Sequence, residues 1–405
     1  MEIFLIFLYV IINLTIVCYY IIKREDGIFT PPFIVSAISL SVMLPQLTTL
    51  YFINDYNNEL IPTLCYTMIT CNIAFLWGFK KGENRKLPSK LFYIDLSRCK
   101  LIILLSAIAG FGALLGIGDG VIVSLFMGFS QIAIAFSLTY FLANGQERSN
   151  IYIVSLLLGC IIVLNYTFFI YGSRGSALFL FLAVLYFLYL KYPKYKTVCK
   201  YAVITFLLLG SVVSASISSF RENLHGDIGK VDYVDNFKKA FYNSNSEVGM
   251  DLGNAAILIE YCKKSDSYNY GSIFWNGFVY NYVPERVVGK STKESLQYIP
   301  AYEKLIEPLT HGVTTVTGYF EAFATWGYLG FFTFMIIGFL VGVIWNRAKY
   351  SSFYMILLLF SLGNIPLMVT HNLQYIFQRW ELIILFSMAF CFYAFTRVPL
   401  YQDEF

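Results

Sequence analysis

Residues 325–346 read TWGYLGFFTFMIIGFLVGVIWN, contain no charged side chain, and are followed at once by Arg347 and Lys349. A helix needs about 20 mainly apolar residues to cross the hydrocarbon core of a membrane. The stretch therefore predicts a transmembrane helix. Lys and Arg gather in the short cytoplasmic loops of membrane proteins, so Arg347 and Lys349 also predict which end of this helix is inside.

The composition of the whole chain agrees with this stretch. Of the 405 residues, 58% are apolar and 13% are charged, whereas soluble proteins carry about 25% charged residues. The mean hydropathy is +0.63. A chain this long and this apolar must present apolar surface to lipid. The formal net charge of +4 is too small to indicate a nucleic-acid partner.

Further segments predict membrane spans, about eleven in all. The first of them, residues 2–22, has no basic leading region and no small-residue cleavage site. Lys23 and Arg24 follow it, so we expect a membrane span and not a cleavable signal peptide. The predicted fold class is all-α, a polytopic bundle of transmembrane helices. The predicted spans are 2–22, 31–53, 61–79, 101–117, 121–143, 151–170, 176–190, 201–219, 325–346, 351–369 and 380–396.

Basic residues in the short loops predict the orientation. The loops that would lie opposite the cytoplasm, 54–60, 118–120, 171–175 and 370–379, hold only Arg174 and Arg379. We therefore expect the N-terminus outside and the C-terminus inside. The other set of loops holds seventeen basic residues: Lys23, Arg24, Lys80, Lys81, Arg85, Lys86, Lys90, Arg98, Lys100, Arg148, Lys191, Lys194, Lys196, Lys200, Arg347, Lys349 and Arg397.

The orientation places one long polar segment, residues 220–324, outside the membrane. It carries about half of the 25 acidic residues, and it separates membrane helices in 1–219 from those in 325–405. Apolar residues at helical spacing in 233–243 and 254–262 predict a small helical cap over the outer face. Cys262 lies in this segment, and we expect the other seven cysteines, none in a CxxC pair, to act as small apolar residues.

All three histidines, His225, His311 and His371, fall on the predicted outer side. A histidine titrates at about pH 6.5 and can take a proton from a sugar hydroxyl, although a structural hydrogen bond is an equally common role. His311, which precedes a descent into the membrane that contains Glu321, is the best candidate for a base. The histidines lack a zinc-site spacing such as HExxH, and we expect neither a metal nor another cofactor.

Arg174 is the most informative cation. It lies in YGSRGS, residues 171–176, between two apolar stretches that almost touch. An arginine at the centre of a membrane helix costs about 2.5–3.5 kcal/mol on insertion scales. An arginine near the edge, which costs less, either extends toward lipid phosphates or lines an anion site. Further outward cations are Arg221, Arg286, Lys290 and Arg379. They are either solvated loop charges or ligands of a diphosphate, whose oxygens guanidinium groups bind in pairs.

This layout resembles the Wzy-type oligosaccharide repeat-unit polymerases, which make O-antigen and capsular polysaccharide. The resemblance covers most of the chain by layout. Its sharpest pieces are Gly172-Ser-Arg-Gly175 before a span, Val283-Pro-Glu-Arg-Val-Val-Gly-Lys290 in the long loop, and Gly318-Tyr-Phe-Glu-Ala-Phe-Ala-Thr-Trp-Gly-Tyr-Leu-Gly330 entering the next span. The family often shows a Pro-Arg pair and then Lys-Pro, whereas here Glu285 intervenes and Ser291 follows the lysine.

The resemblance implies a fold like that of the GT-C glycosyltransferases and a place in the bacterial cytoplasmic membrane. It implies glycosyl transfer from one polyprenyl-diphosphate-linked glycan to another, without metal. Arg174 and Arg221 would bind the leaving diphosphate, His311 would be the base, and the remaining candidates, Arg286, Lys290, Glu321, Arg379 and His371, would be secondary. The partners would be the lipid-linked glycan, the bilayer and a chain-length regulator.

Three other functions compete with this one. A polysaccharide flippase or other transporter is less favoured because the chain shows no matching halves and because charged residues avoid the centres of the predicted spans. An enzyme that takes sugar from a polyprenyl monophosphate usually has a large first outer loop, whereas residues 54–60 are few. An O-antigen ligase is the closest alternative, and His371-Asn372 resembles part of its His–Asn signature.

Overall fold

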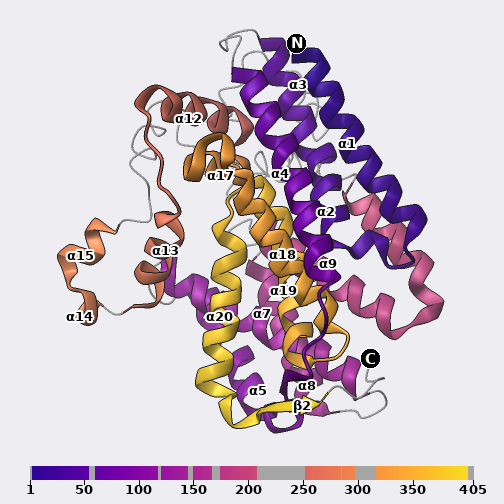
Figure 1. Ribbon diagram of the computed structural model, residues 1–405. Coiled ribbons are helices and arrows are strands. Elements are labelled where there is room, and N and C mark those ends of the chain that lie inside the picture. Colours follow the sequence, from indigo (N-terminus) through magenta and orange to yellow (C-terminus); the bar gives the residue numbers. More distant parts are fainter. Residues whose placement is uncertain are drawn as a thin grey trace, which may run out of the picture.

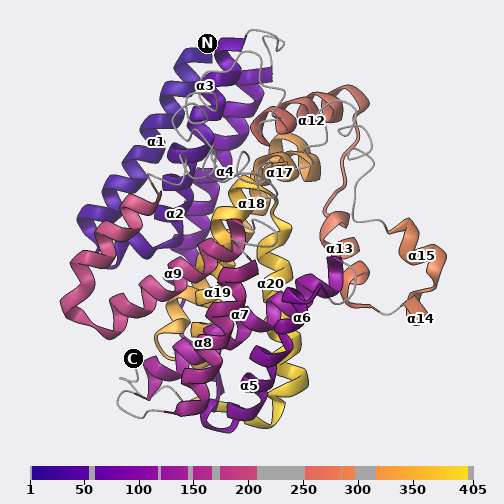
Figure 2. The ribbon, with the colours of Figure 1, turned by 180° about the vertical axis from the view of Figure 1, so that it is seen from behind.

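The computed structural model describes residues 2–53, 60–116, 120–144, 149–166, 174–207, 251–283, 285–296 and 316–399. In this part of the chain, long helices form an elongated bundle, and a smaller group of helices lies along one side of it (Figures 1 and 2). The predicted all-α membrane bundle is confirmed at this level, because six of the described helices are long and apolar enough to cross a membrane. Three shorter apolar helices accompany them: Lys100–Leu114, Asn150–Asn165 and Leu178–Lys191.

The helices of the bundle follow the predicted spans closely over most of the chain. The second span is continuous but contains a π-helical turn, η2, between its two α-helical parts. Pro31 and Pro32 begin that span, as proline favours the first helical turn. The bundle helices are α1 (Glu2–Lys23), α2 (Pro31–Ile38), η2 (Ser39–Met43), α3 (Leu44–Ile53), α4 (Leu60–Glu83), α5 (Lys100–Ala109), α6 (Phe111–Leu114), α7 (Gly120–Ala143), α8 (Asn150–Asn165), α9 (Arg174–Lys191), α18 (Phe331–Ala348), α19 (Ser352–Thr370) and α20 (Gln374–Phe390).

The closest helix contact joins α4 and α18, which run in the same direction. Gly78 and Gly82 lie on α4, and Gly338 and Gly342 lie on α18 at the same four-residue spacing. A Cβ atom added at Gly78 would strike the carbonyl oxygen of Met335, and one added at Gly338 would strike that of Phe75. Paired small residues of this kind let membrane helices approach until their backbones touch. The contact therefore depends on the absence of side chains at these positions.

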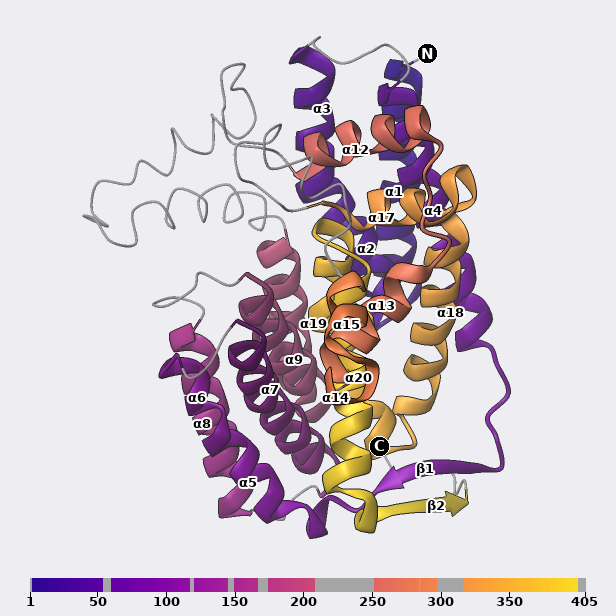
Figure 3. The same ribbon diagram turned by 90° about the vertical axis from the view of Figure 1, so that its left-hand side faces the viewer.

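Helix ends that adjoin the predicted cytoplasmic loops lie together at one end of the bundle. Arg24 forms ion pairs with Asp26 and Glu83, and Lys196 pairs with Glu25 at 2.7 Å. Two short antiparallel strands also lie at this end, β1 (Lys90–Ile94) and β2 (Phe395–Pro399), with Ile94 opposite Phe395. Figure 3 shows the strands far from the start of α1. The sequence analysis did not predict these strands.

Helices from the predicted long loop pack at the other end. The helix expected at 254–262 lies within α12 (Asp251–Ser265), whose Leu252 N–H donates to Gln46 Oε1 of α3 over 2.9 Å. α13 (Ser272–Tyr282) contacts α20 through the rings of Phe274 and Phe377, whose centroids are 5.1 Å apart. α14 (Glu285–Val288) and α15 (Lys290–Ser295) follow α13. The other helix expected in the loop, 233–243, lies outside the described residues.

Two boundaries differ from the predicted spans. The last helix occupies Gln374–Phe390 instead of 380–396, and the chain then forms η8 (Phe392–Ala394) and β2. The prediction failed because Arg379 was assigned to the outer loop, whereas it lies in the second turn of α20. The span predicted at 325–346 is preceded by a separate helix, α17 (Gly318–Trp326), and the turn η7 (Gly327–Leu329) separates it from α18.

The glycine contact can be tested with Gly338→Ala. The added methyl group would meet the Phe75 carbonyl, and such overpacking costs about 1–3 kcal/mol. We expect a lower midpoint of thermal unfolding in detergent. Ile336→Ala is the matched control because Ile336 lies on the same helix with 52% of its surface exposed. Equal effects of the two substitutions would contradict a close contact at Gly338.

Candidate functional site at the α17 junction

α17 is a short helix enclosed by the bundle. Thr317 caps it, because the Thr317 side chain accepts a hydrogen bond from Phe320 N–H over 3.2 Å. Gly327 ends it with a positive φ of 59°, which favours glycine. Every residue from Gly318 to Thr325 is buried. The helix therefore contacts protein on all sides, and its polar side chains must find partners within the bundle.

Glu321 joins α17 to the beginning of α20. Its Oε2 atom accepts from the Leu373 N–H over 2.7 Å, and its Oε1 atom accepts from Gln374 Nε2 over 3.5 Å. Leu373 is the cap residue of α20, whose first N–H groups have no partner within the helix. A carboxylate at that end also complements the helix dipole. In this arrangement Glu321, only 2% exposed, positions two elements relative to each other.

Tyr319 joins α17 to the N-terminal helices. The Tyr319 hydroxyl lies 2.8 Å from Ser39 Oγ and donates to Asn72 Oδ1 over 2.8 Å. Asn72 Nδ2 in turn donates to Ser39 Oγ and to Asn13 Oδ1, over 3.0 and 2.9 Å. Tyr9 completes the network by donating to the Ser39 carbonyl over 3.1 Å. All five side chains are buried, and the sequence analysis missed them, although a single asparagine within an apolar span is a signal of such pairing.

His371 lies in the turn between α19 and α20, two residues before Leu373. Its Nδ1 atom is 2.8 Å from Thr370 Oγ1, and the Thr370 hydroxyl is 3.0 Å from the Pro366 carbonyl. A hydroxyl has one proton, so donation to Pro366 makes Thr370 an acceptor from the His371 Nδ1–H. The His371 side chain is half-buried.

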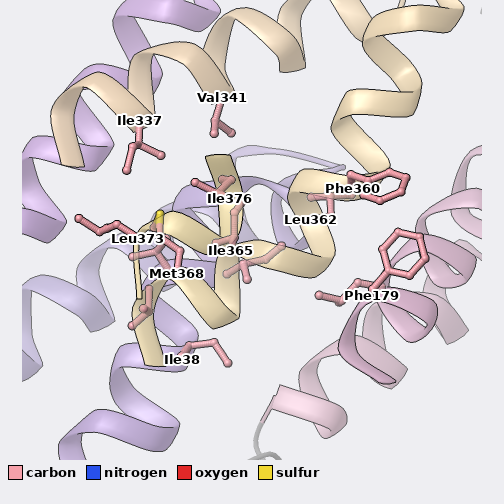
Figure 4. Packing of buried hydrophobic residues seen from close by; sticks show 14 of the residues in the cluster. Ile38, Phe179, Ile337, Val341, Phe360, Leu362, Ile365, Met368, Leu373 and Ile376 are labelled. Atoms are coloured by element: carbon pink, nitrogen blue, oxygen red, sulfur yellow. The ribbon is translucent and has the colours of Figure 1, made fainter. Parts of the chain in front are cut away.

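Arg174 begins α9 at the same end of the bundle. Phe179 of α9 lies against Gly363 of α19, where an added Cβ would strike the Phe179 backbone. Figure 4 shows Phe179 beside Phe360 of α19 and, near the same helix, Met368 and Leu373. The two helices are antiparallel, and α-helices rise about 1.5 Å per residue. The backbone of Arg174 is therefore level with residue 368, close to the height of His371.

Arg379 and Glu381 are ionisable residues within α20. Arg379 faces α7, and its Nη1 atom would lie 3.5 Å from a Cβ atom at Gly128. The absence of a side chain at Gly128 makes room for Leu382 of α20, whose Cδ2 atom that Cβ atom would strike, and the Arg379 guanidinium lies beside it at ordinary contact distance. Glu381 is near the middle of the helix, and its Oε2 atom is buried with no hydrogen-bond partner in the described part of the chain. Our expectation that charged residues avoid span centres is wrong at this helix.

The remaining candidates are not brought to the junction by the described residues. Arg286 and Lys290 are exposed on α14 and α15, which Figures 1 and 2 show extended away from the bundle. Arg221, His225 and His311 lie outside the described residues. Within the described ranges, no group of three or more His, Cys, Asp or Glu side chains is arranged to hold a metal ion.

The same end of the bundle thus carries Glu321, His371, Arg379 and the backbone of Arg174, on four separate helices or turns. This end of the bundle combines a carboxylate held by two hydrogen bonds, the imidazole of His371 and the guanidinium of Arg379. No family model, curated protein or solved structure matches the chain.

The role of Glu321 can be tested with Glu321→Gln and Glu321→Ala. Alanine leaves the buried Leu373 N–H without its acceptor, at a cost of about 1–3 kcal/mol. Glutamine keeps an oxygen in reach, so we expect a smaller loss of thermal stability from it than from alanine. Glu25→Ala, which removes an exposed ion pair, should leave the unfolding midpoint unchanged. If Glu321→Ala is as stable as Glu25→Ala, Glu321 does not hold α20.

Proposed function

We propose that the protein is a membrane-embedded glycosyltransferase that polymerises polyprenyl-diphosphate-linked oligosaccharide repeat units. The supporting observation is that His371, Arg379 and the backbone of Arg174 lie toward the end of the bundle where α12 and α13 pack. In the proposed topology of about eleven spans, this end faces outward, the N-terminus is outside and the C-terminus is in the cytoplasm. A GT-C-like arrangement of helices and a bacterial cytoplasmic membrane belong to the same proposal.

The proposed reaction is attack by an acceptor sugar hydroxyl on the anomeric carbon of the donor glycan. The hydroxyl proton goes to a base, the new glycosidic bond forms, and the bond to polyprenyl diphosphate breaks. Arg174 and Arg221 would stabilise the negative charge on the leaving diphosphate, which is the term that usually contributes most to such catalysis. Arg379, Arg286 and Lys290 would assist in binding.

The base is assigned to His311 by resemblance, and His371 is the second candidate. His371 lies two residues before Leu373, whose N–H donates to Glu321. Glu321, in contrast, has both carboxylate oxygens engaged by Leu373 and Gln374, which suits a positioning role better than proton transfer. No metal ion or other cofactor is part of the proposed reaction. A chain-length regulator is a proposed partner.

The polymerase proposal can be tested in cells that need this protein for long polysaccharide chains. We expect Arg174→Ala and Arg174→Lys to shorten the chains strongly, since lysine lacks the paired donors of the guanidinium group. Loss of one charge-stabilising donor typically lowers the rate about 10²–10³-fold. The measurement is the ladder of chain lengths on a gel at equal protein level. Full-length chains from both variants would exclude Arg174 as a diphosphate ligand.

The two histidines can be compared in the same assay. Loss of a general base lowers the rate about 10²–10⁴-fold, so only one of His311→Ala and His371→Ala should show that loss. Lys196→Ala is a control at the opposite end of the bundle and should make normal chains. An unchanged ladder from both histidine variants would leave the proposed reaction without either base.

A flippase for lipid-linked glycans is the second candidate, and Glu381 is the observation that favours it. A carboxyl group within a membrane helix is typical of proton relays in transporters. Purified protein in liposomes separates the two functions, because a polymerase lengthens lipid-linked repeat units whereas a flippase only moves them between leaflets. We expect lengthening that Glu381→Gln does not abolish. Movement without lengthening, lost in Glu381→Gln, would favour the flippase.

A further inference from the structure

Cys99 and Cys391 are distant in the sequence but meet at the end of the bundle that carries the two strands. Cys99 is the residue before α5, and Cys391 is the residue after α20. Both are fully buried, and both are free thiols. The function proposed above does not use them.

A series of backbone contacts brings these two cysteines together. Ile94 and Phe395 are paired in the sheet, and the Asp95 N–H then donates to the Ala394 carbonyl over 3.0 Å. One step further, the Tyr393 hydroxyl donates to the Arg98 carbonyl over 2.9 Å. The two chain segments run antiparallel, so each contact brings the next residues opposite each other. Cys99 and Cys391 are the next pair in this series.

The two thiols differ in acidity. A hydrogen bond from the Cys391 thiol to the Cys99 sulfur lowers the pKa of Cys99, although burial and the negative charge of Asp95 oppose this shift. The same hydrogen bond, together with burial, raises the pKa of Cys391. Cys99 also stands at the N-terminal end of α5, where the helix dipole favours a thiolate, and its sulfur lies 3.6 Å from the Asp95 carbonyl oxygen. Cys99 is therefore the nucleophile of the pair, and Cys391 is the resolving thiol.

We propose that Cys99 and Cys391 form a redox-active thiol pair that closes to a disulfide on reaction with a peroxide or a low-molecular-weight disulfide. With hydrogen peroxide, the Cys99 thiolate attacks one oxygen and breaks the O–O bond. Cys99 becomes a sulfenic acid, and hydroxide leaves and takes up a proton to form water. The Cys391 sulfur then attacks the Cys99 sulfur, and the second oxygen leaves as water after taking up a proton. Two thiols and one peroxide give one disulfide and two waters.

The disulfide would link the start of α5 to the end of α20. Both are helix ends, already aligned by the strand pair, so the link joins segments that are neighbours before it forms. Thiols facing the cytoplasm are normally kept reduced, and this end carries the basic loops that predict a cytoplasmic face. In that location the pair would be reduced in unstressed cells and oxidised under oxidant load.

The proposal can be tested on the purified full-length protein in detergent. The reduced protein is treated with diamide or hydrogen peroxide, denatured, and labelled with a maleimide–polyethylene glycol that adds mass at each remaining thiol. Of the eight cysteines, we expect two to become unreactive after oxidation and to return after treatment with dithiothreitol. Mass spectrometry of a digest should identify a peptide pair linked through Cys99 and Cys391.

Single variants decide whether this pair is responsible. Cys99→Ser and Cys391→Ser should each abolish the loss of labelling, and Cys99→Ala and Cys391→Ala serve if a serine variant is unstable. Cys262→Ser is the matched control, because Cys262 is also buried but outside the pair, and it should keep the response. Retention of all labels by the wild-type protein, a link between other cysteines, or an unchanged response in Cys99→Ser would overturn the proposal.

The order of reactivity provides a second measurement. In the native reduced protein near neutral pH, iodoacetamide should alkylate Cys99 faster than Cys391, as mass spectrometry of quenched samples would show. Faster alkylation of Cys391 would contradict the assignment of Cys99 as the nucleophile.

Discussion

The hydrogen bonds of α17 are the interaction on which the arrangement of the bundle depends. A buried polar group without a partner costs about 1–3 kcal/mol, so every polar side chain on this enclosed helix restricts what can lie next to it. The Tyr319 hydroxyl is hydrogen-bonded to Ser39 and Asn72, and Asn72 is hydrogen-bonded to Asn13. Glu321 accepts a hydrogen bond from the buried Leu373 N–H at the start of α20. A helix of nine residues thus sets the positions of elements from both halves of the chain.

The glycine contact of α4 and α18 stabilises the bundle by close backbone packing and not by hydrogen bonds between side chains. Lipid tails are as apolar as leucine side chains, so apolar surface alone does not drive two membrane helices together, whereas close backbone packing does. Gly78, Gly82, Gly338 and Gly342 provide that packing along a shared direction. Gly330 extends it, because an added Cβ there would meet the Ala322 carbonyl of α17. The same packed pair therefore supports the helix that carries Glu321.

These buried contacts fix the backbone positions of the candidate site residues. The imidazole of His371 and the guanidinium of Arg379 are carried by a turn and a helix whose start is bonded to Glu321, so their backbone positions are set by buried contacts. Reacting groups are most effective when the surrounding structure holds them before substrate arrives. Glu321, expected from its sequence context to be a secondary catalytic residue, is better placed to provide that support.

The sequence by itself determined the fold class, the approximate positions of most helices and the grouping of the basic loops at one end. It could do so because the length of an apolar run and the charge of a loop are local properties, and these decide which segments enter a membrane. It did not predict the bounds of the last helix, because Arg379 is a charged residue that the sequence alone assigns to a loop, whereas it lies inside α20. Nor could it pair Glu321 with Leu373 or Cys99 with Cys391, which are far apart in the chain. Only the tertiary structure decided these pairings, because hydrogen bonding between buried groups depends on which helix faces lie against each other, and a single sequence does not contain that information.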